Sequence, residues 1–97
     1  LRRCLMYRPS WITKSQLEVA YEEGLKLLNA FCFATDGEQS WTEIEIDGNF
    51  FDIECFQETE QDDVVCNVYP TYATKGGKYR ETDVSQAIRL CTRKGGA

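Results

Sequence analysis

The 97-residue sequence contains no histidine and only two prolines. Histidine is the side chain used most often for acid–base catalysis near neutral pH, and it is a frequent zinc ligand. Its absence excludes Ser–His and Cys–His catalytic pairs and histidine-containing zinc sites. The sequence therefore favours a protein that is not an enzyme, and it predicts no cofactor and no metal site.

A long hydrophobic run is also missing. The longest uncharged stretch early in the chain is residues 27–35, whereas a membrane-spanning helix needs about 20 apolar residues. The first residues contain arginines but no apolar run of signal-peptide length. The sequence thus predicts a cytoplasmic protein with no membrane partner. Met6 offers a start for a reading frame, which would make residues 1–5 a leader or a vector remnant.

Cysteine is present, but in an odd number and without a Cys-x-x-Cys pair. Four of the five cysteines have apolar neighbours in the sequence: Cys32, Cys55, Cys66 and Cys91. Such cysteines are typically reduced, buried and equivalent to small hydrophobic residues, as in a reducing compartment. A disulfide framework is the alternative.

The composition is that of a folded globular protein, with 42% hydrophobic and 28% charged residues. A chain of this size can bury one hydrophobic core but not two. We therefore expect a single domain over residues 1–97, with loosely ordered ends at residues 1–12 and 94–97.

Residues 13–33 have the hydrophobic spacing of an amphipathic helix. Two capping boxes compete for its start, Ser15 with Glu18 and Thr13 with Gln16. Either box would satisfy backbone N–H groups at the first turn, so the helix should begin within a few residues of position 13.

The hydrophobic period changes to two after this helix. Residues 41–47 and 49–56 alternate, and the Asp47–Gly48 step between them is a strong signal for a two-residue hairpin turn. A third strand is expected over residues 64–69, ending at Pro70 because proline cannot donate to a ladder.

The last quarter of the chain predicts a short fourth strand near the Gly76–Gly77 turn and then a helix capped by Thr82 or Asp83. The apolar face of that helix would contain Val84, Ala87, Ile88 and Cys91. The order α-β-β-β-(β)-α predicts an α+β two-layer sandwich, with an antiparallel sheet of three or four strands and an N-terminal and a C-terminal helix.

The hairpin turn also predicts the register of the two strands. Ile44 then faces Phe51 on the core side, while Glu43 faces Asp52 on the other side. Carboxylates directly opposite each other destabilise a sheet, and such local conflicts often mark function. The residues expected on this second side, the acidic face, are Trp41, Glu43, Glu45, Phe50, Asp52, Glu54 and Phe56.

Three interpretations of the acidic face remain open: a solvated surface, a contact surface for a basic partner, and a catalytic or cation-binding site. The charge pattern supports the second. Residues 27–74 contain eleven acidic residues and no Lys or Arg, whereas residues 1–26 carry +2 and residues 75–97 carry +4. The net charge of -5 conceals this separation. A cationic surface would be attracted to the central block.

The sequence therefore predicts a small acidic module that binds protein, either as a homodimer or by docking onto a basic protein surface. Spaced carboxylates could also mimic nucleic-acid phosphates, while the acidic charge does not favour nucleic acid itself as a partner. The small size and the lack of motifs are typical of an accessory protein of a phage or other mobile element.

A small-molecule-binding domain is the alternative function. Its apolar pocket would lie between the helices and the sheet, with aromatic walls from Tyr21, Phe31, Phe51 and Tyr69. The same four aromatic residues would equally fit an ordinary hydrophobic core.

Overall fold

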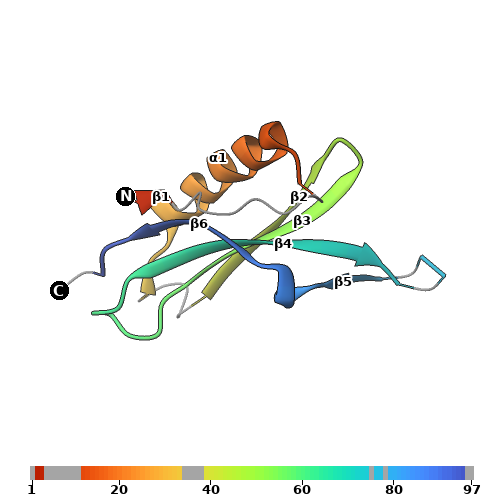
Figure 1. The fold of residues 1–97 in the computed structure, drawn as a ribbon. Coiled ribbons are helices and arrows are strands. Elements are labelled where there is room, and N and C mark those ends of the chain that lie inside the picture. The colour runs from red at the N-terminus through yellow and green to blue at the C-terminus, as the bar shows by residue number, and fades with distance from the viewer. Residues whose placement is uncertain (1, 4–11, 34–38, 75, 78, 96–97) are drawn as a thin grey trace.

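The computed structural model describes residues 2–3, 12–33, 39–74, 76–77 and 79–95. In these ranges one α-helix lies across one face of an antiparallel sheet (Figure 1). The strand order is β1-β6-β4-β3-β2, and β5 pairs with the end of β4. The elements are β1 (Arg2–Arg3), α1 (Lys14–Ala30), β2 (Gln39–Ile46), β3 (Asn49–Phe56), β4 (Val64–Ala73), β5 (Arg80–Thr82), the 3-10 turn η1 (Val84–Gln86) and β6 (Ile88–Arg93). The α+β class is confirmed.

Helix α1 begins where the second of the two capping boxes predicts. The Thr13 hydroxyl accepts a hydrogen bond from the Gln16 N–H at 3.1 Å, and the Gln16 side chain accepts one from the Thr13 N–H at 3.0 Å. The prediction of a start at Ser15 and Glu18 is therefore wrong. Gln16 is buried, and its side-chain amide also donates to the backbone carbonyl of Ile46 at 3.4 Å, which satisfies a polar group away from water.

The β2–β3 hairpin has the predicted turn and register. Asp47 and Gly48 both have positive φ, 52° and 82°, as a two-residue hairpin turn requires. Ile44 pairs with Phe51, and Glu43 pairs with Asp52. Because strand side chains alternate, this register decides which residues of the hairpin contact the helix.

Strand β4 continues past Pro70 to Ala73, so the prediction that the strand ends at Pro70 is wrong. The Pro70 carbonyl accepts a hydrogen bond from the Asp83 N–H at 2.9 Å. In a strand the N–H and C=O of one residue point to the same edge, so the missing N–H of Pro70 faces the gap between β6 and β5. Proline is tolerated there because no ladder bond is lost.

The predicted C-terminal helix is also wrong. Asp83 does cap a turn, since its carboxylate accepts a hydrogen bond from the Ser85 N–H at 3.0 Å, but this turn ends at Gln86. Residues 88–93 form β6 instead, which pairs with β4 and thereby satisfies the backbone groups along that edge. The sheet consequently has more than the three or four strands expected.

A β-bulge explains why the sequence of β6 resembled a helix. Cys66 pairs with Cys91 and the next residue of β4, Asn67, pairs with Arg89, so Leu90 is an extra residue on β6. Leu90 and Cys91 are both fully buried. A bulge of this kind interrupts the alternation of buried and exposed residues, which removes the period-2 signal of a strand.

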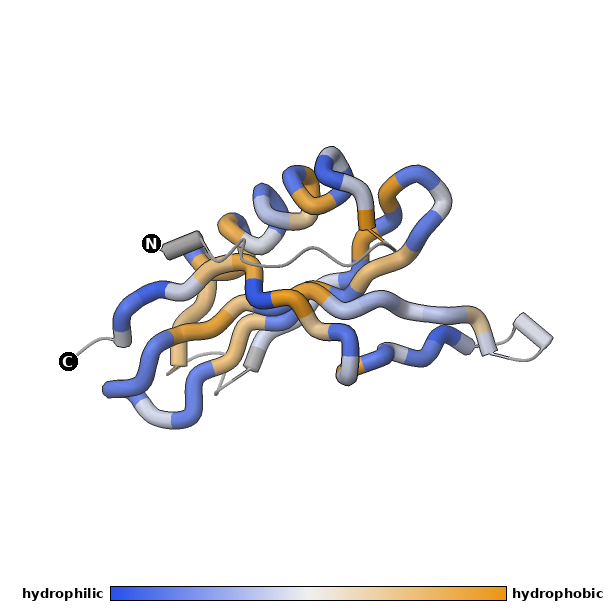
Figure 2. Tube along the Cα trace, in the orientation of Figure 1, coloured by the Kyte–Doolittle hydropathy of each residue, from blue (hydrophilic) through white to orange (hydrophobic). Residues whose placement is uncertain are grey.

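The hydrophobic core lies between α1 and the sheet. Gly24 allows the helix to approach closely, since a Cβ atom at this position would lie 2.9 Å from Leu90 Cδ1 and 3.3 Å from Cys66 Sγ. Hydrophobic residues run along the central strands, and hydrophilic residues occupy the turns (Figure 2). The largest fully buried side chains include Ile12, Leu28, Phe51, Ile53, Val64, Val68 and Leu90.

The two ends of the chain are described only in part. Arg2 and Arg3 pair with Thr92 and Cys91 of β6, and Ile12 is fully buried beside α1 in the core cluster. The remaining residues of the segment predicted to be loosely ordered at the N-terminus, and residues 96–97, lie outside the described residues. In the described ranges, no helix has both the length and the apolar character needed to span a membrane.

Candidate functional site

The face of the sheet opposite α1 carries the predicted acidic face. Phe51, Ile53 and Cys55 of β3 point to the core and are buried, whereas their neighbours on the same strand are only partly buried. Trp41 pairs with Glu54, and Glu45 pairs with Phe50, as the predicted register requires. The acidic face is therefore assembled as the sequence predicts.

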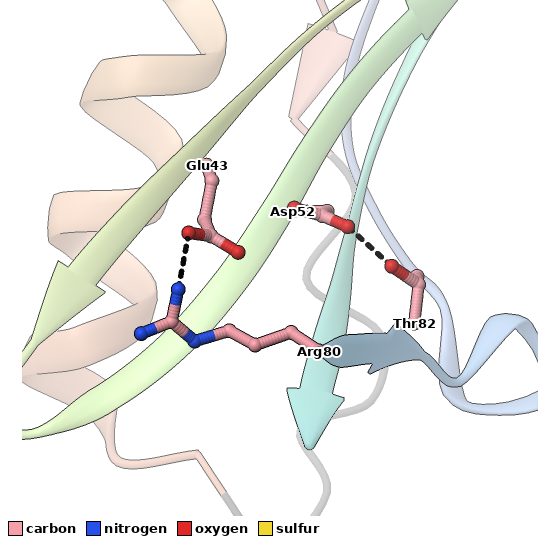
Figure 3. A network of polar contacts seen from close by, with 4 residues as sticks. All are labelled: Glu43, Asp52, Arg80 and Thr82. Atoms are coloured by element: carbon pink, nitrogen blue, oxygen red, sulfur yellow. Dashed lines mark hydrogen bonds and ion pairs between the residues drawn. The ribbon is translucent and has the colours of Figure 1, made fainter. Parts of the chain in front are cut away.

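An arginine from the C-terminal part of the chain lies on this face. The Arg80 guanidinium is 3.0 Å from Glu43 Oε1 and 3.5 Å from the centre of the Phe50 ring. Figure 3 shows its side chain extending from β5 across the sheet to Glu43 on β2. The ion pair is partly exposed, so its contribution to stability is small, at most about 1 kcal/mol. Its geometry nevertheless shows that the acidic face accommodates a guanidinium.

Strand β5 also brings Thr82 to the acidic face. The Thr82 hydroxyl donates a hydrogen bond to the carboxylate of Asp52 (Figure 3). Glu43 and Asp52, the like-charged pair, thus each have a partner from β5. These contacts offset the repulsion expected between the two carboxylates. Arg80 is 37 positions after Glu43 in the chain, and Thr82 is 30 positions after Asp52.

Beside these contacts the acidic face contains an open groove of about 290 Å³. Residues from four strands and from η1 line it: Trp41, Asp52, Glu54, Tyr69, Thr82 and Val84. Asp52 and Glu54 belong to β3 and are flanked by Trp41 on β2 and Tyr69 on β4, and the segment from β5 to η1 forms one rim. The pairing of β5 with β4 and the hydrogen bond from the Asp83 N–H to the Pro70 carbonyl hold this segment against the sheet.

The walls of the groove combine exposed apolar groups with carboxylates. The side chains of Trp41 and Val84 are 65% and 71% exposed, high values for large hydrophobic residues. Tyr69 is nearly buried; burial, and secondarily the nearby Glu54 carboxylate, raise the pKa of its hydroxyl above the ordinary value. Asn67 contacts the same hydroxyl at 3.4 Å. Exposed hydrophobic residues beside charged ones are typical of binding surfaces.

The predicted site residues divide into three groups. Trp41, Asp52 and Glu54 line the groove. Glu43 and Phe50 hold Arg80 instead. The last two, Glu45 and Phe56, lie on the same face but are not among the groove's lining residues.

Sequence reasoning missed three contributors to the site. Arg80 was not among the predicted residues of the acidic face, Val84 was expected on the apolar face of a helix, and Thr82 was considered only as a cap. Their positions follow from the path of the chain after Pro70, where β5 pairs with β4. The sequence predicted two parts of this segment, the short strand near the Gly76–Gly77 turn and the Asp83 cap, but not their place beside the acidic face.

The four aromatic residues of the alternative pocket do not gather at one site. Phe31 and Phe51 are buried in the core, and Tyr21 is partly buried against it. Tyr69 lines the groove on the opposite face of the sheet, because it pairs with Asp52 and not with a core residue.

Three cysteines form a row across the core side of the sheet. Cys55 pairs with Cys66, and Cys66 pairs with Cys91; all three are free thiols and fully buried. Hydrogen bonds with the two neighbouring thiols, together with burial, raise the pKa of Cys66 well above its ordinary value. The prediction of burial is confirmed for these three cysteines and is wrong for Cys32, which is exposed.

Neither a metal site among the described residues nor similarity to known proteins indicates a function for this chain. In the described part of the chain, no group of three or more His, Cys, Asp or Glu side chains is placed to hold a metal ion. Comparisons with protein-family models, with curated proteins and with solved structures found no match. The groove and the acidic face around it therefore provide the basis for a functional proposal.

Proposed function

We propose that this protein is a non-enzymatic binding module whose acidic face docks onto a basic surface of another protein. The observation that carries the proposal is the groove, in which the exposed Trp41 and Val84 lie beside the carboxylates of Asp52 and Glu54. Exposed aromatic residues commonly act as anchors in protein interfaces, and complementary charge around them provides specificity and fast association.

The contact with Arg80 supports a basic partner. A guanidinium from the same chain already lies on Phe50 and Glu43 at one end of the acidic face. A cation from a partner would meet the same combination of aromatic ring and carboxylate in the adjoining groove. The partner's charge is therefore inferred from a contact within the protein as well as from composition.

A different protein is favoured over a second copy of this chain. The homodimer hypothesis depends on the basic ends of one chain, residues 1–26 and 75–97, meeting the acidic face of another. Two of those basic residues are engaged within the chain: Arg80 pairs with Glu43, and Arg93 donates to the carbonyls of Leu28 and Phe31 at the end of α1 at 2.9 and 3.2 Å. Light scattering should therefore find a monomer, and a stable dimer would contradict this choice.

A reducing compartment such as the cytoplasm is part of the proposal. Cys55, Cys66 and Cys91 lie side by side as free thiols on paired strands. Adjacent thiols of this kind persist where cellular reductants keep cysteines reduced.

Charge reversal on the acidic face tests the proposed function. Glu45→Lys combined with Glu54→Lys should weaken binding to a short synthetic basic peptide by about tenfold or more, and added salt should slow association with the unmodified protein. Glu43 and Asp52 are left unchanged because Arg80 and Thr82 link them to β5, so reversing their charge would also disturb one rim of the groove.

The matched control reverses two exposed charges away from the acidic face, with Glu22→Lys on α1 and Glu58→Lys after β3. Both double variants change the net charge equally, so long-range attraction is weakened to a similar extent in both. Titration calorimetry should show the larger loss for the variant with lysines on the acidic face. Equal losses would mean that net charge alone attracts the peptide, and the acidic face would not be the docking surface.

A further inference from the structure

The lining of the groove indicates which kind of side chain it would accept. Its two charged residues, Asp52 and Glu54, are both acidic and lie two positions apart on the same face of β3. That spacing corresponds to roughly 7 Å along a strand. A single extended cationic group placed between the two carboxylates can therefore interact with both.

Each carboxylate in the groove has an aromatic residue next to it. Glu54 is directly opposite Trp41 on β2, and Asp52 is directly opposite Tyr69 on β4. Arg80 illustrates what such a combination binds, since its guanidinium stacks on Phe50 while it pairs with Glu43. The groove repeats this arrangement with a larger aromatic surface and with two carboxylates instead of one.

The carboxylates retain capacity for another donor. Asp52 accepts a hydrogen bond from Thr82, and the Glu54 carboxylate contributes to the raised pKa of Tyr69. A carboxylate offers about four acceptor positions, so the partners already present on Asp52 and Glu54 leave room for further N–H donors. A guanidinium has five such donors in a plane, which can contact two carboxylates at once.

The groove is large enough for one extended side chain. Its volume of about 290 Å³ lies at the lower end of the range of small-molecule pockets, which usually enclose about 300–1,000 Å³. It is also open along the sheet surface, so a side chain attached to a partner's backbone can enter it.

We propose that the groove binds an arginine side chain of the partner protein, with the guanidinium stacked on Trp41 and hydrogen-bonded to Asp52 and Glu54. This inference rests on the proposed function and names the residue that the acidic face recognises. Arginine is preferred over lysine because its planar group stacks on aromatic rings and is more weakly hydrated than an ammonium.

Two synthetic peptides of equal length and charge test the inference, one with arginines and one with lysines at the same positions. The protein has two tryptophans, so a Trp11→Phe variant leaves Trp41 as the only indole emitter. The arginine peptide should bind roughly fivefold more tightly and should change Trp41 fluorescence at saturation.

Removing one carboxylate without changing its shape gives the second readout. Glu54→Gln should weaken binding of the arginine peptide by about tenfold, the effect expected for loss of a charge-assisted hydrogen bond. The matched variant Glu22→Gln, at an exposed position on α1, should weaken binding by no more than about twofold, because it removes the same charge away from the groove.

The possible results separate the two proposals. Equal binding of both peptides, with equal losses from Glu54→Gln and Glu22→Gln, would overturn the arginine site and leave the broader proposal of a basic partner standing. If neither peptide binds the folded protein, both proposals are overturned. Preference for arginine together with a Trp41 signal and a selective loss from Glu54→Gln would support both.

Discussion

The two faces of the β2–β3 hairpin share one backbone but differ in solvent exposure. Phe51 and Ile53 point toward α1 and are 1% and 0% exposed, whereas Phe50 and Asp52, one position earlier on the same strand, remain partly exposed. The difference arises because a 17-residue helix covers one face, while among the described residues only the segment from β5 to η1 crosses the other. A strand thus provides two surfaces, and the elements packed on each surface decide which is core and which is available for binding.

The covers of the two faces also differ in chemistry. Helix α1 approaches its face through Gly24 and meets the buried thiol of Cys66, whose Sγ lies 3.6 Å from the Gly24 carbonyl oxygen. The segment from β5 to η1 instead contacts its face through polar groups, since Arg80 and Thr82 reach carboxylates. Hydrophobic burial stabilises the first contact, and weaker, partly solvated interactions stabilise the second.

Truncating neighbouring phenylalanines should separate the two faces most clearly. Phe51→Ala should lower the free energy of unfolding by about 3–5 kcal/mol, because a fully buried aromatic ring is replaced by a cavity. Phe50→Ala should cost only about 1 kcal/mol, mainly through the lost contact with the Arg80 guanidinium. Urea unfolding monitored by circular dichroism measures both values.

A loss of about 3–5 kcal/mol is a large part of the stability of a small domain and is enough to unfold a marginally stable one. Ile53→Val is then the substitute on the core side, with an expected cost of about 0.5–1.5 kcal/mol. Similar costs for Phe50→Ala and Phe51→Ala would contradict the assignment of core and open faces.

Filling the space at Gly24 tests how closely the helix must approach. Gly24→Leu should destabilise the protein by about 1–3 kcal/mol, because its side chain would collide with Leu90 and Cys66. The same substitution at the exposed Ala30 of α1 should change stability by about 0.5 kcal/mol or less. If Gly24→Leu is as stable as Ala30→Leu, the helix does not pack against the sheet at this point.

The raised pKa of Tyr69, on the open face of the sheet, should have the smallest effect on the free energy of unfolding. Burial keeps this hydroxyl protonated in the folded protein at a pH where the unfolded chain, with a tyrosine pKa of about 10, has begun to lose the proton. The stability that Tyr69 contributes is therefore complete below about pH 10 and is lost as the pH rises through the pKa of the folded state.

Tyr69→Phe should remove that part of the pH dependence. Urea unfolding of both proteins between about pH 8 and pH 11 should show stability falling less steeply for the variant. Tyr79→Phe, at a side chain that is 71% exposed, is the matched control. Parallel pH profiles for Tyr69→Phe and the unmodified protein would show that Tyr69 does not titrate in a buried environment.

The hairpin could be predicted from sequence because its information is local. The Asp47–Gly48 turn and the alternation on either side of it determine the register, and the register determines the acidic face. For the start of α1, the sequence left two possible capping boxes. The box of Thr13 and Gln16 forms, and Gln16 then also reaches the carbonyl of Ile46.

The C-terminal part could not be predicted because its structure depends on distant partners. The spacing of Val84, Ile88 and Cys91 fits a helix. In the structure, residues 88–93 instead pair with the edge of β4 as a strand with a bulge at Leu90. Arg93 of this strand donates hydrogen bonds to the carbonyls of Leu28 and Phe31 at the end of α1, a contact that no local pattern indicates. Backbone groups along a sheet edge require partners, and this requirement overrides a short amphipathic pattern.

The sequence by itself determined the α+β class, the first helix, the hairpin register and the separation of an acidic centre from basic ends, because turns, caps and alternation act over a few residues. Only the tertiary structure decided that Arg80 and Thr82 meet Glu43 and Asp52, that Tyr69 faces away from the core, and that these elements leave a groove beside Trp41. Those contacts join residues 30 or more positions apart, and the path of the backbone after Pro70 brings them together.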